Sequence, residues 1–317
     1  MKIPGKLSVL LLFLVIAAAS ALSQQDGPTI TFKSNVNLVL VDTTVRDQKG
    51  RIVSGLQKAN FHVLEDGVEQ PIRVFSESQL PLAIAIVVDK SGSMRHLFAD
   101  LRDSAVRALS ALHPQDRVAL FAFDRQVERL TDLTSDHEEI ARAFERLDAG
   151  GGTDILDAVY EASRYLKLAA PKERRALVLI SDNISFRFFN RRRENEIVNT
   201  ALEFETDIHS IQVRQGFGFG LTGPIVPIPG TKLERVSISQ ITKNTGGEIT
   251  HSGSGSAGKT LAEVIDRIRK RYALGYYASP NSKPGQFHRL QVQLTDNQGK
   301  QFKDYSVAAR SGYYSAK

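Results

Sequence analysis

Apolar and polar residues alternate between residues 30 and 80, in short runs that turn signals interrupt. The run over 36–45 predicts a strand that is buried on one face, because every second side chain points the same way. That face carries Val39, Val41, Thr43 and Val45. Further along, Glu-Asp-Gly at 65–67 predicts a hairpin, since glycine accepts the positive φ of a tight turn. A return strand is predicted over Val68–Phe75, so this part of the chain is expected to be β-structure only.

The pattern changes at residue 81. Leu82–Val88 is a continuous apolar run, which is typical of a strand buried on both faces of a parallel sheet. Apolar runs then alternate with segments of helical period. The predicted strands are Leu82–Val88, Arg117–Phe123, an edge strand over Gln126–Leu133, Ala176–Ile180 and Ile208–Val213, and the predicted helices are Leu97–Leu112, His137–Leu147, Thr153–Leu168, Glu194–Glu205, Leu233–Lys243 and Lys259–Lys270. This alternation predicts an α/β fold with a doubly wound, mostly parallel sheet over 81–271.

Short β runs resume after the α/β segment, over Tyr272–Ala278, Phe287–Leu294 and Tyr305–Tyr314. Neither β flank has enough strands to be stable by itself. We therefore expect residues 24–80 and 272–317 to combine into one small β-sandwich, into which the α/β domain is inserted.

The first 23 residues predict a secretory signal peptide. Lys2 and Lys6 form the positively charged start, Leu7–Ala19 is apolar except for one serine, and Ala-Ser-Ala at 19–21 is a small-residue cleavage site. The alternative is a membrane anchor, but the apolar run is shorter than the roughly 18–20 residues that span a bilayer. We expect cleavage near 21–23, a secreted or periplasmic mature chain, and no stable membrane anchor afterwards.

Composition narrows the classes of function. The chain of 317 residues has no cysteine, which excludes disulfide scaffolds, zinc ribbons, iron–sulfur clusters and thiol nucleophiles. Without Lys2 and Lys6, 39 basic residues stand against 35 acidic ones, a net charge of +4. This excess is too small to predict nucleic-acid binding without a focused basic patch.

Five oxygen-bearing side chains are predicted to meet at one edge of the α/β sheet. Asp89, Ser91 and Ser93 follow the first buried strand, Asp182 ends a later one, and Thr153 begins a helix after a triple-glycine loop. Ligands of open α/β sheets bind outside the carboxyl ends of the strands. Hard oxygen donors favour Mg²⁺, with Mn²⁺ and Ca²⁺ as alternatives. The competing interpretation is that the two aspartates cap helices while the hydroxyl groups bond to loop backbone.

These elements resemble the von Willebrand factor A domain family and its metal-ion-dependent adhesion site (MIDAS). Asp89, Ser91 and Ser93 match its D-x-S-x-S element, Thr153 its middle element and Asp182 its last one; Asn follows Asp182 where the family usually has glycine. The resemblance implies that the two serines, and sometimes Thr153, touch the ion directly. It implies that the aspartates act mainly through water, and that a partner's carboxylate completes the coordination. The β flanks resemble those of the VWFA-related secreted proteins of Acidobacteria.

An aromatic and basic rim is predicted around this site, from the segment after Asp182 and from a glycine-rich loop after the strand that ends at Val213. Its members are Phe186, Arg187, Phe188, Arg191, Arg192, Phe217 and Phe219. Such a rim would steer an acidic partner onto the ion. The alternative is a solvated helix start, with the phenylalanines packed against the domain.

No enzyme motif is present: the sequence has no G-x-S-x-G, no Walker A and no HExxH. The leading hypothesis is a non-enzymatic module that captures a protein through a carboxylate on a divalent cation. The alternative is a structural or assembly component of the cell envelope, in which the ion only stabilises a loop.

Overall fold

The computed structural model describes residues 38–77, 80–185, 191–214, 236–253, 255–278, 282–296, 300–302 and 304–315. All of them belong to one compact unit, Asn37–Lys317. The predicted signal peptide lies outside the described residues. Within them, no helix has the length and apolar character that crossing a membrane requires.

A six-stranded sheet forms the centre of the α/β part, in the order β10-β9-β8-β5-β6-β7. Its strands are β5 (Leu82–Asp89), β6 (Arg117–Phe123), β7 (Val127–Arg129), β8 (Arg174–Ser181), β9 (Thr206–Val213) and β10 (Ile249–Ser252). The pairings are parallel except for the edge strand β7, which is antiparallel to β6. Every residue of β5 and β8 is buried, as their continuous apolar runs predict.

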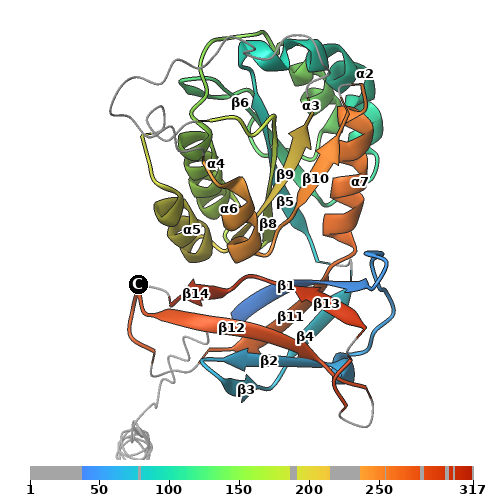
Figure 1. The fold of residues 1–317 in the computed structure, drawn as a ribbon, viewed down its shortest axis with the longest axis vertical. Helices are drawn as coiled ribbons and strands as arrows, with labels where there is room; N and C mark the ends of the chain where they lie inside the picture. Colours follow the sequence, from blue (N-terminus) through green and yellow to red (C-terminus); the bar gives the residue numbers. More distant parts are fainter. Residues whose placement is uncertain are drawn as a thin grey trace, which may run out of the picture. The chain divides into compact units, whose positions relative to one another are not determined.

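Helices cover both faces of this sheet (Figure 1). Ile84, Ile86 and Val88 of β5 pack in one core with α2 (Phe98–Leu109), α3 (His137–Phe144) and α7 (Ala257–Arg269). The intervening β5 residues point the opposite way, into a core with α4 (Ile155–Ala169), α5 (Glu194–Glu203) and α6 (Ile238–Thr245). The predicted doubly wound α/β fold is therefore confirmed.

Two four-stranded antiparallel sheets form the sandwich, in the orders β13-β1-β11-β4 and β14-β12-β2-β3. Their strands are β1 (Leu38–Asp47), β2 (Phe61–Glu65), β3 (Val68–Gln70), β4 (Val74–Glu77), β11 (Tyr272–Tyr277), β12 (Phe287–Leu294), β13 (Tyr305–Ala308) and β14 (Gly312–Tyr314). Strands from before and after the α/β part pair directly, β1 with β11 and β2 with β12. The predicted inward face of β1 is confirmed, since its four residues are at most 2% exposed.

Two of the predicted strands are wrong in extent, because each one is two strands in different sheets. The run over 68–75 divides into β3 and β4, and Pro71 lies at the break. Proline has no N–H to donate to a sheet, so the ladder stops there. The run over 305–314 divides into β13 and β14 around Arg310, whose guanidinium donates to the carbonyl of Leu40. The predicted edge strand over 126–133 is also shorter, since β7 spans only Val127–Arg129.

Buried arginines join the sandwich to the α/β part. Arg174 of β8 donates from Nε to both carboxylate oxygens of Asp42 on β1, at 2.9 and 2.8 Å. Arg271, between α7 and β11, donates to Asp207 at 2.6 Å and to the carbonyl of Asp42 at 2.8 Å. Both arginine side chains are 1% exposed. Because buried charges are tolerated only when they are paired, these contacts fix the two parts against each other.

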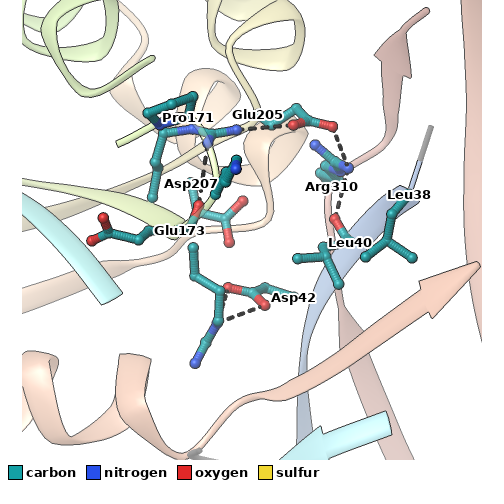
Figure 2. Close-up of a pocket in the computed structure, with 11 residues that line it drawn as sticks. Leu38, Leu40, Asp42, Pro171, Glu173, Glu205, Asp207 and Arg310 are labelled. Atoms are coloured by element: carbon teal, nitrogen blue, oxygen red, sulfur yellow. Dashed lines mark hydrogen bonds and ion pairs between the residues drawn. The ribbon is translucent and has the colours of Figure 1, made fainter. Parts of the chain in front are cut away.

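A charged pocket of about 260 Å³ lies beside these pairs, between β1 and the turns that precede β8 and β9. Figure 2 shows Glu205 in this pocket between two guanidinium groups. Arg175 donates to it at 2.9 Å and Arg310 at 3.4 Å. Burial alone would raise the pKa of Glu205, but the charges of Arg310, Arg175 and Lys167 together lower it below its ordinary value. The surrounding positive charges therefore favour the ionised form of Glu205 in this interface.

Substitution of Arg271 by methionine should destabilise the fold strongly. It removes the cation but leaves the Asp207 carboxyl buried, and breaking such a pair costs about 3 kcal/mol or more. The measurement is urea unfolding of wild type and variant. Arg51→Met is the control, because its side chain is 73% exposed in the pair with Asp47 and its loss should cost less than about 1 kcal/mol. Equal effects of the two substitutions would contradict this role of Arg271.

Candidate metal centre

The carboxyl ends of β5 and β8 bring two of the predicted site residues to one edge of the sheet. These strands are parallel neighbours, with Val88 opposite Ile180. Asp89 is the last residue of β5, and Asp182 directly follows β8. The chain leaves β5 through a loop that enters a 3-10 helix over Gly92–Leu97, so Ser91 and Ser93 lie directly beyond the sheet.

A continuous chain of hydrogen bonds joins four of the five predicted residues. The Ser93 hydroxyl donates to Oδ2 of Asp182 at 2.9 Å, and Oγ of Ser91 lies 3.1 Å from Oγ of Ser93. The backbone N–H of Ser91 donates to Oδ1 of Asp89 at 2.8 Å. Two carboxylates and two hydroxyl groups are thus held together, and Asp89, Ser91 and Asp182 are at most 6% exposed.

Thr153, the fifth predicted residue, lies half-buried on the adjoining glycine-rich loop. The N–H of Gly150 donates to the carbonyl of Lys90 at 2.7 Å, and the hydroxyl of Ser185 donates to the carbonyl of Thr153 at 3.0 Å. A Cβ on Gly150 would lie 2.2 Å from a carboxylate oxygen of Asp124, so a larger residue here would displace the Asp124 side chain. Among the described residues, no hydrogen bond joins the Thr153 side chain to the other four site residues.

Ser181 belongs to this cluster although the sequence analysis did not single it out. Its hydroxyl donates to Oδ2 of Asp89 at 2.7 Å and accepts the N–H of Asn183 at 3.0 Å. Asn183, the departure from the usual glycine, has a φ of 57° and bonds through its side chain to Ser210 in the middle of β9. Asparagine tolerates this left-handed conformation better than most residues, so the turn keeps its shape. The sequence signal that could have identified Ser181 is its position at the end of a buried strand, directly before Asp182.

The burial of Asp89 makes the charged form of its carboxyl group costly. The residue is fully buried, and desolvation raises its pKa to about 6, with a further upward contribution from the charge of Asp182. Hydrogen bonds from Ser91 and Ser181 oppose this rise. Within the described part of the chain, no lysine or arginine forms an ion pair with Asp89. A divalent cation among these oxygens would supply the missing positive charge, and the all-oxygen donor set fits Mg²⁺.

The predicted rim is described only at two arginines, because Phe186, Arg187, Phe188, Phe217 and Phe219 lie outside the described residues. Arg192 packs on the helices: its guanidinium lies 3.4 Å from the ring centre of Tyr160 and donates to Asp157 at 3.0 Å and Glu196 at 2.7 Å. Those contacts give Arg192 a structural role at the start of α5. Arg191 is different, since its side chain is 65% exposed.

The family comparison agrees with this geometry. Residues 84–184 match the family model of the von Willebrand factor type A domain. The matched segment runs from β5 to just beyond Asp182, and therefore contains all five predicted site residues. No curated protein matches the chain.

Solved structures with a similar fold share little sequence with this chain. BatB from Bacteroides thetaiotaomicron is 20% identical, covering 60% of this chain and 99% of its own, with a TM-score of 0.46. A von Willebrand factor type A protein from Catenulispora acidiphila is 12% identical over 88% of this chain and 75% of its own, with a TM-score of 0.49. Proximal thread matrix protein 1 of the mussel byssus, with zinc in its MIDAS motif, is 15% identical, covering 65% of this chain and 50% of its own, with a TM-score of 0.48. Likeness at this distance carries no information on the ligand or partner of this chain.

The raised pKa of Asp89 predicts a pH-dependent stability in chelator. Its folded pKa of about 6 lies above the ordinary value of 3.8, so the folded state binds this proton more tightly than the unfolded state. The stability it contributes is present below about pH 4 and is lost as the pH rises to about 6, by up to about 3 kcal/mol. Urea unfolding across this window should therefore show a fall in wild type that Asp89→Asn lacks. Excess Mg²⁺ should remove most of the fall, and parallel curves for the two proteins in chelator would contradict the account.

Proposed function

We propose that this protein is a secreted or periplasmic binding module that captures an acidic protein partner through a divalent cation held at the Asp89–Asp182 edge. The observation that carries this proposal is the hydrogen-bonded set of buried carboxylates and hydroxyl groups at the carboxyl ends of β5 and β8. The family match over 84–184 supports it, since this segment is similar to a domain type with such sites. We place the chain near the VWFA-related secreted proteins on the resemblance of its β flanks.

The donor set supports Mg²⁺ as the resident ion, with Mn²⁺ and Ca²⁺ as alternatives. Mg²⁺ binds few protein oxygens and retains several waters, which an incoming ligand can replace. A carboxylate is the natural ligand to replace one of them, because it is a hard, anionic oxygen donor. The partner therefore contributes an aspartate or glutamate side chain or a chain terminus.

An exposed arginine that contacts the residue after Thr153 supports an acidic partner. Arg191 lies 3.8 Å from Asp157 and 3.9 Å from Asp154, at the start of α4, with most of its side chain in solvent. Such a charge raises the rate of encounter with an anionic surface more than it raises affinity. We propose a binding role and no catalytic one, in keeping with the absence of the G-x-S-x-G, Walker A and HExxH motifs from the sequence.

The proposal is tested by capture from an envelope extract of the producing organism. Immobilised wild-type protein in Mg²⁺ should retain a protein that chelator releases, because the bridge consists of the ion. Asp182→Ala should not retain it, whereas Ser163→Ala should, since Ser163 is a buried residue whose hydroxyl has no hydrogen-bond partner in the described part of the chain.

A further control tests whether carboxyl groups of the partner bind the ion. Amidation of the captured protein's carboxyl groups should abolish its retention. A partner that stays bound in excess chelator, equally to wild type and Asp182→Ala, would overturn the proposal and favour the structural or assembly role instead.

A further inference from the structure

Two carboxylates and an imidazole meet on the sandwich, at the hairpin between β2 and β3. Glu65 ends β2, Asp66 forms the hairpin corner, and His288 comes from the neighbouring strand β12. One ligand atom from each of the three lies within 4.8 Å of the other two. Glu65 and His288 are buried, while the Asp66 side chain is 49% exposed, so solvent reaches the group from one side.

The surrounding contacts hold one oxygen of each carboxylate and leave the other directed at His288. Oε2 of Glu65 accepts hydrogen bonds from the hydroxyl groups of Tyr276 and Tyr313. Oδ1 of Asp66 accepts the backbone N–H of Arg289 at 2.8 Å. Oε1 of Glu65 and Oδ2 of Asp66 are then the atoms that lie 3.6 and 2.8 Å from Nδ1 of His288. Outer hydrogen bonds of this kind orient ligands around metal ions.

The environment of Glu65 provides a second observation that favours a cation at this group. It is 6% exposed, yet within the described residues no donor lies within hydrogen-bond distance of its Oε1. No lysine or arginine of the described chain forms an ion pair with Glu65 or Asp66. Two carboxylates therefore share one imidazole, and Oε1 of the largely buried Glu65 faces the group with no hydrogen-bond donor among the described residues. The two tyrosine hydroxyl groups satisfy only Oε2, so Oε1 is suited to a cation.

His288 can serve as the third ligand. Its ring is held by stacking on Tyr313, with the ring centres 5.2 Å apart, and its Nε2 has no hydrogen-bond partner among the described residues. Nδ1 donates to Oδ2 of Asp66 at 2.8 Å, so an ion that binds Nδ1 displaces this proton, and metal binding at this group releases a proton.

We propose that Glu65, Asp66 and His288 form a zinc site that is separate from the Asp89–Asp182 edge. Bonds of about 2.1 Å from one ion to atoms 2.8 and 3.6 Å apart subtend about 85° and about 120°, which a zinc coordination sphere accommodates. An imidazole with two carboxylates favours Zn²⁺ over the Mg²⁺ that the all-oxygen edge favours. The ion clamps the β2–β3 hairpin to β12, and water fills the remaining position on the exposed side.

Calorimetric titration of the full chain with Zn²⁺, in excess Mg²⁺ that occupies the oxygen edge, tests this site. Wild type should bind one Zn²⁺ per chain under these conditions. Asp66→Asn and His288→Gln should each weaken the affinity for Zn²⁺ at least tenfold. Asp66→Asn is the safer variant for folding, because asparagine tolerates the φ of 51° at this corner. Cobalt bound in place of zinc should show a visible absorption spectrum that His288→Gln loses.

Two matched variants make the result decisive. His62→Gln should leave zinc binding unchanged, because His62 also faces a carboxylate, that of Glu69 at 2.6 Å, but pairs with no second one among the described residues. Asp89→Ala should also leave it unchanged, which separates this site from the proposed partner-binding site. No zinc binding in Mg²⁺, binding that survives Asp66→Asn and His288→Gln, or binding that Asp89→Ala removes would each overturn the proposal.

Discussion

A carboxylate buried at the end of a fully buried strand is the constraint on which the site depends. Asp89 has no exposure to solvent, and the groups that approach it are the hydroxyl of Ser181 and the amide of Ser91. Neutral donors reduce the cost of its charge but do not cancel it, as its raised pKa reflects. The second carboxylate, Asp182, adds to this cost. A bound dication resolves the conflict, and the neighbouring serine hydroxyls present the oxygens that would receive it.

The rest of the fold keeps this arrangement rigid. β5 and β8 pack against helices on both faces, so the strand ends that carry Asp89 and Asp182 have little freedom to separate. At the opposite end of β8, Arg174 connects the sheet to Asp42 of the sandwich. The sandwich is therefore not a flexible appendage of the α/β part: it is attached through paired charges that are excluded from water.

The sequence predicted those features that depend on local pattern. The linear sequence alone shows the apolar run of β5, the change of period at residue 81 and the order of Asp89, Thr153 and Asp182. The α/β class follows from these patterns. Features that depend on distant pairing were missed. Nothing local indicates that Arg271 meets Asp207, or that Ser181 bonds to Asp89, because these contacts arise only when the sheet forms. The two divided strands show the same limit. Alternation continues through Pro71 and Arg310, but the chain changes sheet at both positions.

Thermal unfolding against Mg²⁺ concentration tests the central claim most directly. An ion that binds only the folded chain raises its stability by about 2.7 kcal/mol at a hundredfold excess over Kd. The account predicts a saturable rise in wild type and in Ser163→Ala, and none in Asp182→Ala, with Mn²⁺ and Ca²⁺ as comparison ions. No rise with any of the three ions, or an equal rise in Asp182→Ala, would contradict a metal centre at the Asp89–Asp182 edge.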